Sequence, residues 1–172
     1  MTREELMARW LTPNGVRRRE QVIELIRAGD EEWAAPLHGF TGADEIRYDE
    51  DLRGIDFSHL QLERAVLRFA RLDHARLDGA QLDHAQLQHA NLSDASLKGA
   101  QIRDAMMTGI KGERACFDEA DLSRSFLDSG NLSLASFRNA ILNHTSFAYT
   151  QMSGCDLTGA AMEGTDLCET RD

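Results

Sequence analysis

A large hydrophobic residue recurs at every fifth position from Leu52 to Leu167, and this period constrains the fold more than any other feature of the chain. Of the 24 positions in this register, 23 carry Leu, Ile, Met or Phe, and the exception is Gly112. A second register of small residues, mostly alanine, lies two positions before each large residue from Ala65 onward. The other three positions of each five are mostly polar. Two residues of every five are therefore expected to point into a core.

The period of five fits neither the 3.6-residue period of an α-helix nor the two-residue period of a β-strand. It fits a chain that turns a corner after every fifth residue. Four corners close a square coil of about 20 residues, and successive coils then stack at about 4.8 Å, the spacing of paired strands. The 24 pentapeptides predict about six coils, each in contact only with its neighbours.

The pattern A-(D/N)-L-x-x is clearest in residues 90–94 and 120–124, which read ANLSD and ADLSR. With this many copies in phase, the chain resembles the pentapeptide repeat family over residues 50–169. The resemblance implies an all-β solenoid, a right-handed quadrilateral β-helix, for residues 50–172.

One segment departs from the pattern. Residues 109–114 lack both inward residues in their usual form, yet the phase is the same before and after them. We predict a loosened or bulged side at Gly112 and no inserted loop.

Residues 1–49 lack the repeat, and we expect a small α-helical N-terminal cap there. Thr2 and Glu5 fit a capping box that opens a helix reaching to about Trp10. The sequence Pro-Asn-Gly at 13–15 indicates a break, and 16–28 has helical spacing with Gly29 as its stop. Residues 31–37 are expected to form a third helical turn.

A cap would cover the unpaired backbone at the open end of the β-helix, which otherwise invites aggregation. The apolar contact is expected from Trp10, Trp33, Leu37 and Phe40. The alternative is that these helices form a small partner-binding module.

Composition excludes several classes of protein. The net charge of −10 disfavours direct nucleic-acid binding, which needs Lys and Arg against phosphates, but it suits a partner with a basic surface. The three cysteines have no CxxC spacing and are expected to be reduced thiols. We expect no membrane span and no signal peptide, and hence a cytoplasmic protein.

Residues 20 apart should lie one above another, so the residue number assigns each outward side chain to a side of the coil. Three sides are polar. The fourth carries an apolar stripe, which we predict to be either a surface covered by residues 1–49 or a partner-binding site; single scattered apolar residues are the remaining interpretation. Its residues are Val66, Phe69, Met106, Phe126 and Tyr149.

One polar side is a candidate acidic face. It sets five carboxylates against the three cations Arg76, Lys98 and Arg138. The carboxylates are Asp56, Asp78, Asp118, Glu119 and Asp156.

Five histidines share one position of the pentapeptide. His74 and His84 should stack below Asp94 and Asp104, but two ligands fall short of the three or four of a zinc site. We interpret the histidines as polar ladders on solvated turns. No catalytic, cofactor-binding or metal-binding residues are predicted, since no catalytic motif occurs and a filled rod offers no concave pocket.

Two functions remain open. The first is a non-catalytic protein-binding rod, a scaffold or interaction module. The second follows from the resemblance, because family members include DNA mimics that bind DNA gyrase, a type II topoisomerase, and protect it against inhibitors such as quinolones. Those proteins typically dimerise through an apolar C-terminal module, whereas this chain ends in Glu-Thr-Arg-Asp. A homodimer through the open C-terminal coil is also an expectation.

Overall fold

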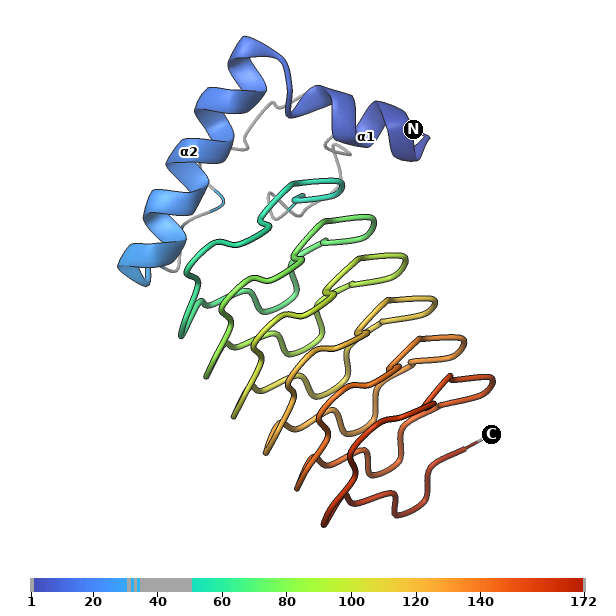
Figure 1. The fold of residues 1–172 in the computed structure, drawn as a ribbon. Coiled ribbons are helices and arrows are strands. Elements are labelled where there is room, and N and C mark those ends of the chain that lie inside the picture. Colours follow the sequence, from blue (N-terminus) through green and yellow to red (C-terminus); the bar gives the residue numbers. More distant parts are fainter. Residues whose placement is uncertain (1, 31, 33, 35–50, 172) are drawn as a thin grey trace.

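The computed structural model describes residues 2–30, 32, 34 and 51–171 of the chain. Two helices and a stack of coils make up this part (Figure 1). Helix α1 spans Arg3–Arg9 and helix α2 spans Pro13–Ala28. Both helices lie across one end of the stack, beside the coil that begins at Asp51 (Figure 1).

Helix α1 begins with the predicted capping box. The Thr2 hydroxyl accepts a hydrogen bond from Glu5 N–H at 3.2 Å, and the Glu5 carboxylate accepts one from Thr2 N–H at 2.7 Å. Without these two side-chain acceptors, the N–H groups of Thr2 and Glu5 would have no hydrogen-bond partner in the first turn. The helix ends at Trp10, which is buried as predicted.

Helix α2 begins earlier than predicted, so the expected break at residues 13–15 is wrong. Pro13 is the first helical residue, where its missing N–H costs nothing, and the Thr12 hydroxyl caps Gly15 N–H at 3.0 Å. Gly29 ends the helix in the left-handed conformation, with φ of 71°, as predicted. Of the predicted helical turn at 31–37, only Glu32 and Ala34 belong to the described residues, and Trp33, Leu37 and Phe40 lie outside them.

Parallel backbone bridges join residues 20 positions apart throughout 51–171, and this register builds the stack. Six successive bridges connect Asp51 to Arg171 in one column. Two hydrogen bonds flank a bridge: Leu92 N–H donates to Lys111 O at 2.6 Å, and Lys111 N–H donates to Ala90 O at 3.0 Å. The bridges are isolated, so the predicted β-helix contains no extended strand in 51–171. Each side of a coil contributes one bridging residue instead.

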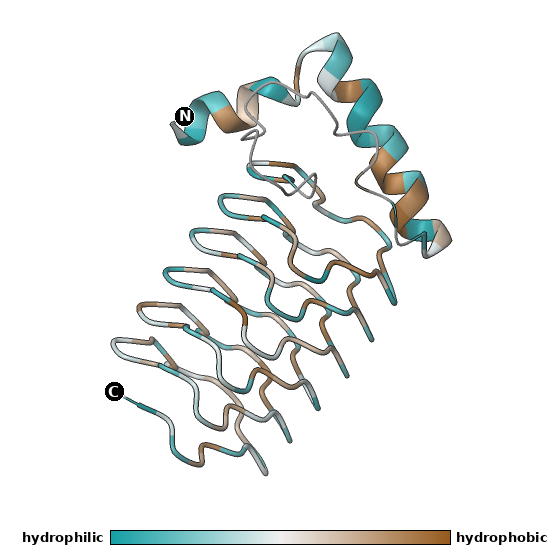
Figure 2. Ribbon diagram, turned by 180° about the vertical axis from the view of Figure 1, so that it is seen from behind, coloured by the Kyte–Doolittle hydropathy of each residue, from teal (hydrophilic) through white to brown (hydrophobic). Residues whose placement is uncertain are grey.

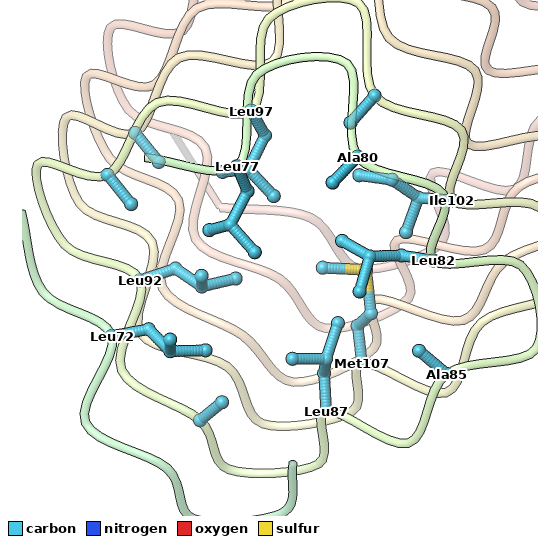
Figure 3. Close-up of a cluster of buried hydrophobic side chains, with 14 of the residues drawn as sticks. Leu72, Leu77, Ala80, Leu82, Ala85, Leu87, Leu92, Leu97, Ile102 and Met107 are labelled. Atoms are coloured by element: carbon cyan, nitrogen blue, oxygen red, sulfur yellow. The ribbon is translucent and has the colours of Figure 1, made fainter. Parts of the chain in front are cut away.

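The inward side chains come from four sides of the coil and stack on their equivalents 20 residues away (Figure 3). Every large inward residue from Leu52 to Phe147 is at most 1% exposed, which confirms the predicted large register. Hydrophobic and hydrophilic segments consequently alternate along each coil (Figure 2). The pairs labelled in Figure 3 are Leu72 and Leu92, Leu77 and Leu97, Leu82 and Ile102, and Leu87 and Met107.

The corners are tight turns closed by one hydrogen bond, as in Ala95 N–H to Leu92 O at 2.9 Å. At Ile102 the Ser125 hydroxyl bridges the turn instead, because it accepts Ala105 N–H at 3.0 Å and donates to Ile102 O. The third residue of each turn has a positive φ in all 24 pentapeptides, from Gly54 to Glu169, with values between 54° and 75°. A hydrogen bond from the fourth residue to the first and a positive φ at the third are the marks of a type II turn. The backbone therefore demands a left-handed residue at every corner.

Hydroxyl groups replace alanine in the small register of the later coils without leaving a polar group unsatisfied. Thr145 donates to Leu122 O at 2.8 Å, and Thr150 donates to Leu127 O at 2.9 Å. Both threonines are fully buried. Their hydroxyls reach carbonyl groups of the preceding coil, which avoids the cost of an unpaired buried donor.

The side that contains Gly112 is regular, so the predicted bulge is wrong. Gly112 N–H donates to Asn131 O at 2.7 Å, and Ala115 N–H closes the turn to Gly112 O at 3.0 Å. Larger and smaller side chains compensate for one another in adjacent coils. Ile110 fills the small register and is buried, while Leu132 of the next coil fills the space beside Gly112, where a Cβ would lie 2.7 Å from Leu132 Cδ2.

Side chains of the two helices bind carbonyl groups at the exposed end of the first coil. In the later coils, the equivalent carbonyl groups accept N–H groups of the preceding coil, as Arg71 O accepts Leu52 N–H at 2.9 Å. Here Trp10 Nε1 donates to Arg53 O at 2.8 Å, and Arg19 Nε donates to Asp56 O at 2.7 Å. Arg27 Nε donates to Gln61 O at 3.1 Å. The helices therefore satisfy acceptors that a further coil would have satisfied.

A buried ion cluster joins α1 to the stack. Arg9 Nη2 lies 2.9 Å from Asp51 Oδ1, and Arg53 Nη2 lies 2.7 Å from Asp51 Oδ2. Burial raises the pKa of the Asp51 carboxyl, but hydrogen bonds from Arg53 and Arg9 outweigh it and hold the pKa well below its usual range. The carboxylate is thus ionised wherever the protein is folded near neutral pH.

We expect Asp51→Asn to destabilise the protein by roughly 3 kcal/mol, because it leaves buried cationic charge without its counter-ion. The measurement is urea unfolding followed by circular dichroism. The stability that Asp51 provides is present above the ordinary carboxyl pKa of about 4 and is lost as the pH falls below it, through the depressed pKa of the folded state. Wild type and variant should therefore converge in acid. Glu119→Gln, in an exposed pair, is the control, and a pH-independent difference would contradict the assignment.

Two alanine substitutions test the compensation between adjacent coils. A Cβ at Gly130 would lie 3.1 Å from Leu127 O and 3.2 Å from Ile110 O, which are backbone atoms that cannot yield easily. We expect Gly130→Ala to cost about 1 kcal/mol by overpacking. Gly112→Ala meets only the end of the Leu132 side chain, so it should be neutral or stabilising by up to about 1 kcal/mol. Equal effects in thermal unfolding would refute this packing.

Candidate interaction surfaces

The apolar stripe lies on the side of the coil formed by the pentapeptides that begin at residues 66, 86, 106, 126, 146 and 166; we call this the stripe side. Val66, Met106 and Phe126 belong to one bridge column, in which Gln86 separates Val66 from Met106. Met106 and Phe126 are direct neighbours in that column. They form the apolar centre of the stripe.

The other two members occupy the left-handed turn position of the same side. Phe69 stacks on His89 with ring centroids 5.1 Å apart and planes inclined by 14°. Gly109 and Ser129 then separate His89 from Tyr149 in the 20-residue register. The five residues therefore share one side but do not form the contiguous stripe that the sequence suggested.

Helices α1 and α2 bind the end of the stack, and the cover of the stripe by residues 1–49 stays a prediction for the residues that follow these helices. The hydrogen bonds of the two helices to the stack reach residues 51–61, on the first coil. Residues 35–50 lie outside the described part of the chain. Four stripe residues are about half exposed, at 57% for Phe69, 47% for Met106, 52% for Phe126 and 58% for Tyr149.

Two further exposed hydrophobic residues lie on other sides and were missed in the sequence. Leu134 is 57% exposed and occupies a left-handed turn position above Gly154, where a Cβ would lie 2.8 Å from Leu134 Cδ2. Ile141 is 41% exposed in the bridge column of Asp121 and Ala161. The large residue outside the inward register was the signal that could have identified each.

The candidate acidic face is less negative than its five carboxylates suggest. Asp56 itself is ionised, because burial raises its pKa but a hydrogen bond from Ser58 N–H and the charge of Arg76 lower it overall; nearby cations, and not protonation, reduce the charge of the face. Asp118 accepts Arg138 N–H at 3.0 Å. All three cations of the face lie close to a carboxylate: Arg76 is 3.6 Å from Asp56 and 3.7 Å from Asp78, Lys98 is 3.2 Å from Glu119, and Arg138 is 3.7 Å from Asp156.

Ion pairs between successive coils neutralise charge on two other sides. Arg114 Nε donates to Asp94 Oδ1 at 2.8 Å, and Arg124 Nε donates to Asp104 Oδ1 at 2.8 Å. The hydrogen bond from arginine is the main reason that the pKa of each of these aspartates is lowered. Arg103 Nε likewise lies 3.0 Å from Asp83 Oδ2. Acid and arginine are 20 residues apart in every case.

The histidines occupy the left-handed turn position, where His, Asn and Asp are enriched among non-glycine residues. Three of them lie against a glycine of the next coil; a Cβ at Gly79 would be 2.5 Å from His59 Nδ1, and His89 and His144 lie in the same way against Gly109 and Gly164. Among the described residues, no group of three or more His, Cys, Asp or Glu side chains could hold a metal ion. The turn geometry thus accounts for the shared position.

A pocket of about 430 Å³, which the sequence did not predict, lies between the helices and the first coil. Its walls combine the apolar Met7, Trp10, Leu11 and Val16 with Arg19, Asp56 and Arg76, and Gly54 completes the lining.

Cys116, Cys155 and Cys168 are free thiols, as predicted, and burial raises the pKa of Cys116 and Cys155. Neither helix in the described part of the chain is long and apolar enough to cross a membrane.

Solved structures of several pentapeptide repeat proteins are similar to this chain. One from the cyanobacterium Cyanothece 51142 is 19% identical, with 72% of this chain and 91% of that chain covered and a TM-score of 0.45. HetL, involved in heterocyst differentiation regulation in Nostoc sp. strain PCC 7120, is 25% identical, with 70% and 67% covered and a TM-score of 0.30. QnrB1, a plasmid-mediated fluoroquinolone resistance protein, is 21% identical, with 70% and 71% covered and a TM-score of 0.34.

The five-residue repeat also identifies the family of this chain. No curated protein sequence matches the chain. The family model "Pentapeptide repeats (8 copies)" matches residues 51–82, 75–111, 115–148 and 142–171, which together exceed half of the chain. With the five-residue turns, the two inward registers and the 20-residue bridges, this match shows that the chain belongs to the pentapeptide repeat family.

Proposed function

We propose that this chain is a non-catalytic, cytoplasmic protein-binding rod whose partner contacts the stripe side. The observation that carries the proposal is the half-exposure of Phe69, Met106, Phe126 and Tyr149 on one side of the stack. Aromatic residues and methionine are the residue types that protein interfaces favour. Leaving them in water on a single side costs free energy that a partner would recover by covering them.

The rigidity of the stack supports the same function. Each coil is held to the next by backbone hydrogen bonds on all four sides, as at Leu92, Leu97, Ile102 and Met107. Side chains projecting from such a frame lose little further conformational freedom when a partner binds. A rod of this kind presents its contacts in a fixed register, which suits an interaction module.

A second candidate is a DNA mimic that binds gyrase or another type II topoisomerase. The excess of five carboxylates over three cations on the acidic face supports it. The pairing of those cations with carboxylates at 3.2–3.7 Å weakens it, because the field of four of the five carboxylates is partly cancelled. A duplex carries one negative charge per ~1.7 Å of axis, with no cation fixed beside it, and a phosphate-binding surface recognises that density.

Phe126 and Leu134, which are exposed to a similar extent, give a matched test of the rod. A photo-crosslinking amino acid at position 126 should capture a specific protein, whereas one at position 134, on another side, should not. Phe126→Ser should then weaken binding of the captured protein at least ~10-fold, and Leu134→Ser should leave it unchanged. Equal capture or equal weakening at the two positions would rule out the stripe side as the binding surface.

The topoisomerase alternative is tested by titrating the protein into a gyrase supercoiling assay with and without a quinolone. We expect neither inhibition nor protection at micromolar protein, because the three cations of the acidic face partly cancel the charge of its carboxylates. Protection would establish the DNA mimic instead. In that case, Glu119→Lys should abolish the effect, and Phe126→Ser should not.

A further inference from the structure

We infer that the partner of the stripe side is a second copy of this chain, packed antiparallel against the first. The inference rests on the proposed protein-binding role of that side and names the partner. It is carried by the apolar centre of the side and by the opposite charges at its two ends, which face one another when one copy is reversed.

The charges of the stripe side are separated along the axis. Arg68 is the only cation of this side and lies on the first coil, where its Nε donates to Gln86 Oε1 at 2.8 Å. No outward residue between Arg68 and Asp128 on this side is charged. Beyond Asp128, the last coil adds Asp166 and Glu169. One end is therefore positive and the other negative, at a separation of about 24 Å for five steps of paired backbone.

An antiparallel two-fold axis lying in the interface preserves the column and reverses the order of the coils. In the bridge column, Met106 then faces Phe126 of the second copy, and Phe126 faces Met106. In the turn column, His89 faces Tyr149 of the second copy. The apolar centre is thus matched with itself, and sulfur–aromatic and aromatic contacts are both favourable. Such an isologous contact closes at two copies.

The same operation matches the charged ends. Arg68 of one copy falls between Asp166 and Glu169 of the second, and the arrangement occurs twice in the dimer. A parallel dimer would instead place Arg68 opposite Arg68 and each acid opposite itself, and like charges in juxtaposition oppose association. Charge therefore selects the antiparallel arrangement.

The area of one side limits the strength of the dimer. Six bridge steps give a stack about 29 Å long at the spacing of paired strands, and only one of its four sides is used. Stable interfaces bury about 800 Å² on each partner, so this contact is at the small end of the range. We expect dissociation in the micromolar range, weakened further by salt because the end contacts are exposed.

Sedimentation equilibrium of the full chain tests the inference. Wild type should be a reversible dimer at micromolar concentration. Arg68→Glu should weaken association at least ~10-fold, since it places like charges opposite one another at both ends of the interface. The triple variant Arg68→Glu/Asp166→Arg/Glu169→Arg should restore it, because every end pair is again opposite in charge. Phe126→Ser should weaken association similarly, while Leu134→Ser should not.

A wild type that stays monomeric overturns the inference, as does a dimer that ignores Arg68→Glu and Phe126→Ser. Failure of the triple variant to recover association, with its circular dichroism spectrum unchanged, also overturns the antiparallel arrangement. If the chain is monomeric but position 126 crosslinks to a different protein, the second copy is excluded and the protein-binding rod stands. If neither occurs, the stripe side is not a protein-binding surface and both ideas fail.

Discussion

The 20-residue register of backbone hydrogen bonds is the constraint on which the rest of this protein depends. It places each inward residue directly over its equivalent in the next coil, so packing is decided between neighbours in a column. Ile110 is tolerated because Gly130 occupies the equivalent position of the next coil. Gly112 is tolerated because the Leu132 side chain fills the space beside it. A solenoid can therefore absorb departures from its repeat pairwise, without loss of register.

The same register creates a problem at the end of the stack, where carbonyl groups of the first coil have no preceding coil to bind. Helices α1 and α2 solve it with side chains, since Trp10, Arg19 and Arg27 donate to carbonyls of residues 53, 56 and 61. Long cationic side chains reach these acceptors from a helix that has no free backbone donors along its length. Asp51 then supplies the counter-ion that allows Arg9 to be buried beside them.

The sequence predicted the two inward registers and the 20-residue stacking because the period of five is a direct record of the corners. It failed where the outcome depended on neighbours in space. The bulge at Gly112 was wrong because the departure was judged along the chain, whereas its compensation comes from residues 130 and 132. The stripe was overestimated for a different reason: its residues were assigned to a side, but the order along each column was not followed, and Gly109 and Ser129 interrupt the turn column. Pro13 was taken for a breaker although the first turn of a helix accepts proline.

Charge is arranged differently on the stripe side and elsewhere, and the difference bears on function. On other sides, acids and arginines 20 residues apart pair within one molecule, as in Asp94–Arg114 and Asp104–Arg124, so those sides are locally satisfied. On the stripe side, Arg68 and Glu169 lie at opposite ends of a rigid stack, which cannot bend to bring them together. Among the described residues, no opposite charge on this side lies near either end, whereas a second molecule could neutralise both ends and cover Phe126 in between. The rigidity that makes the stack a good frame for binding also makes this one side incomplete by itself.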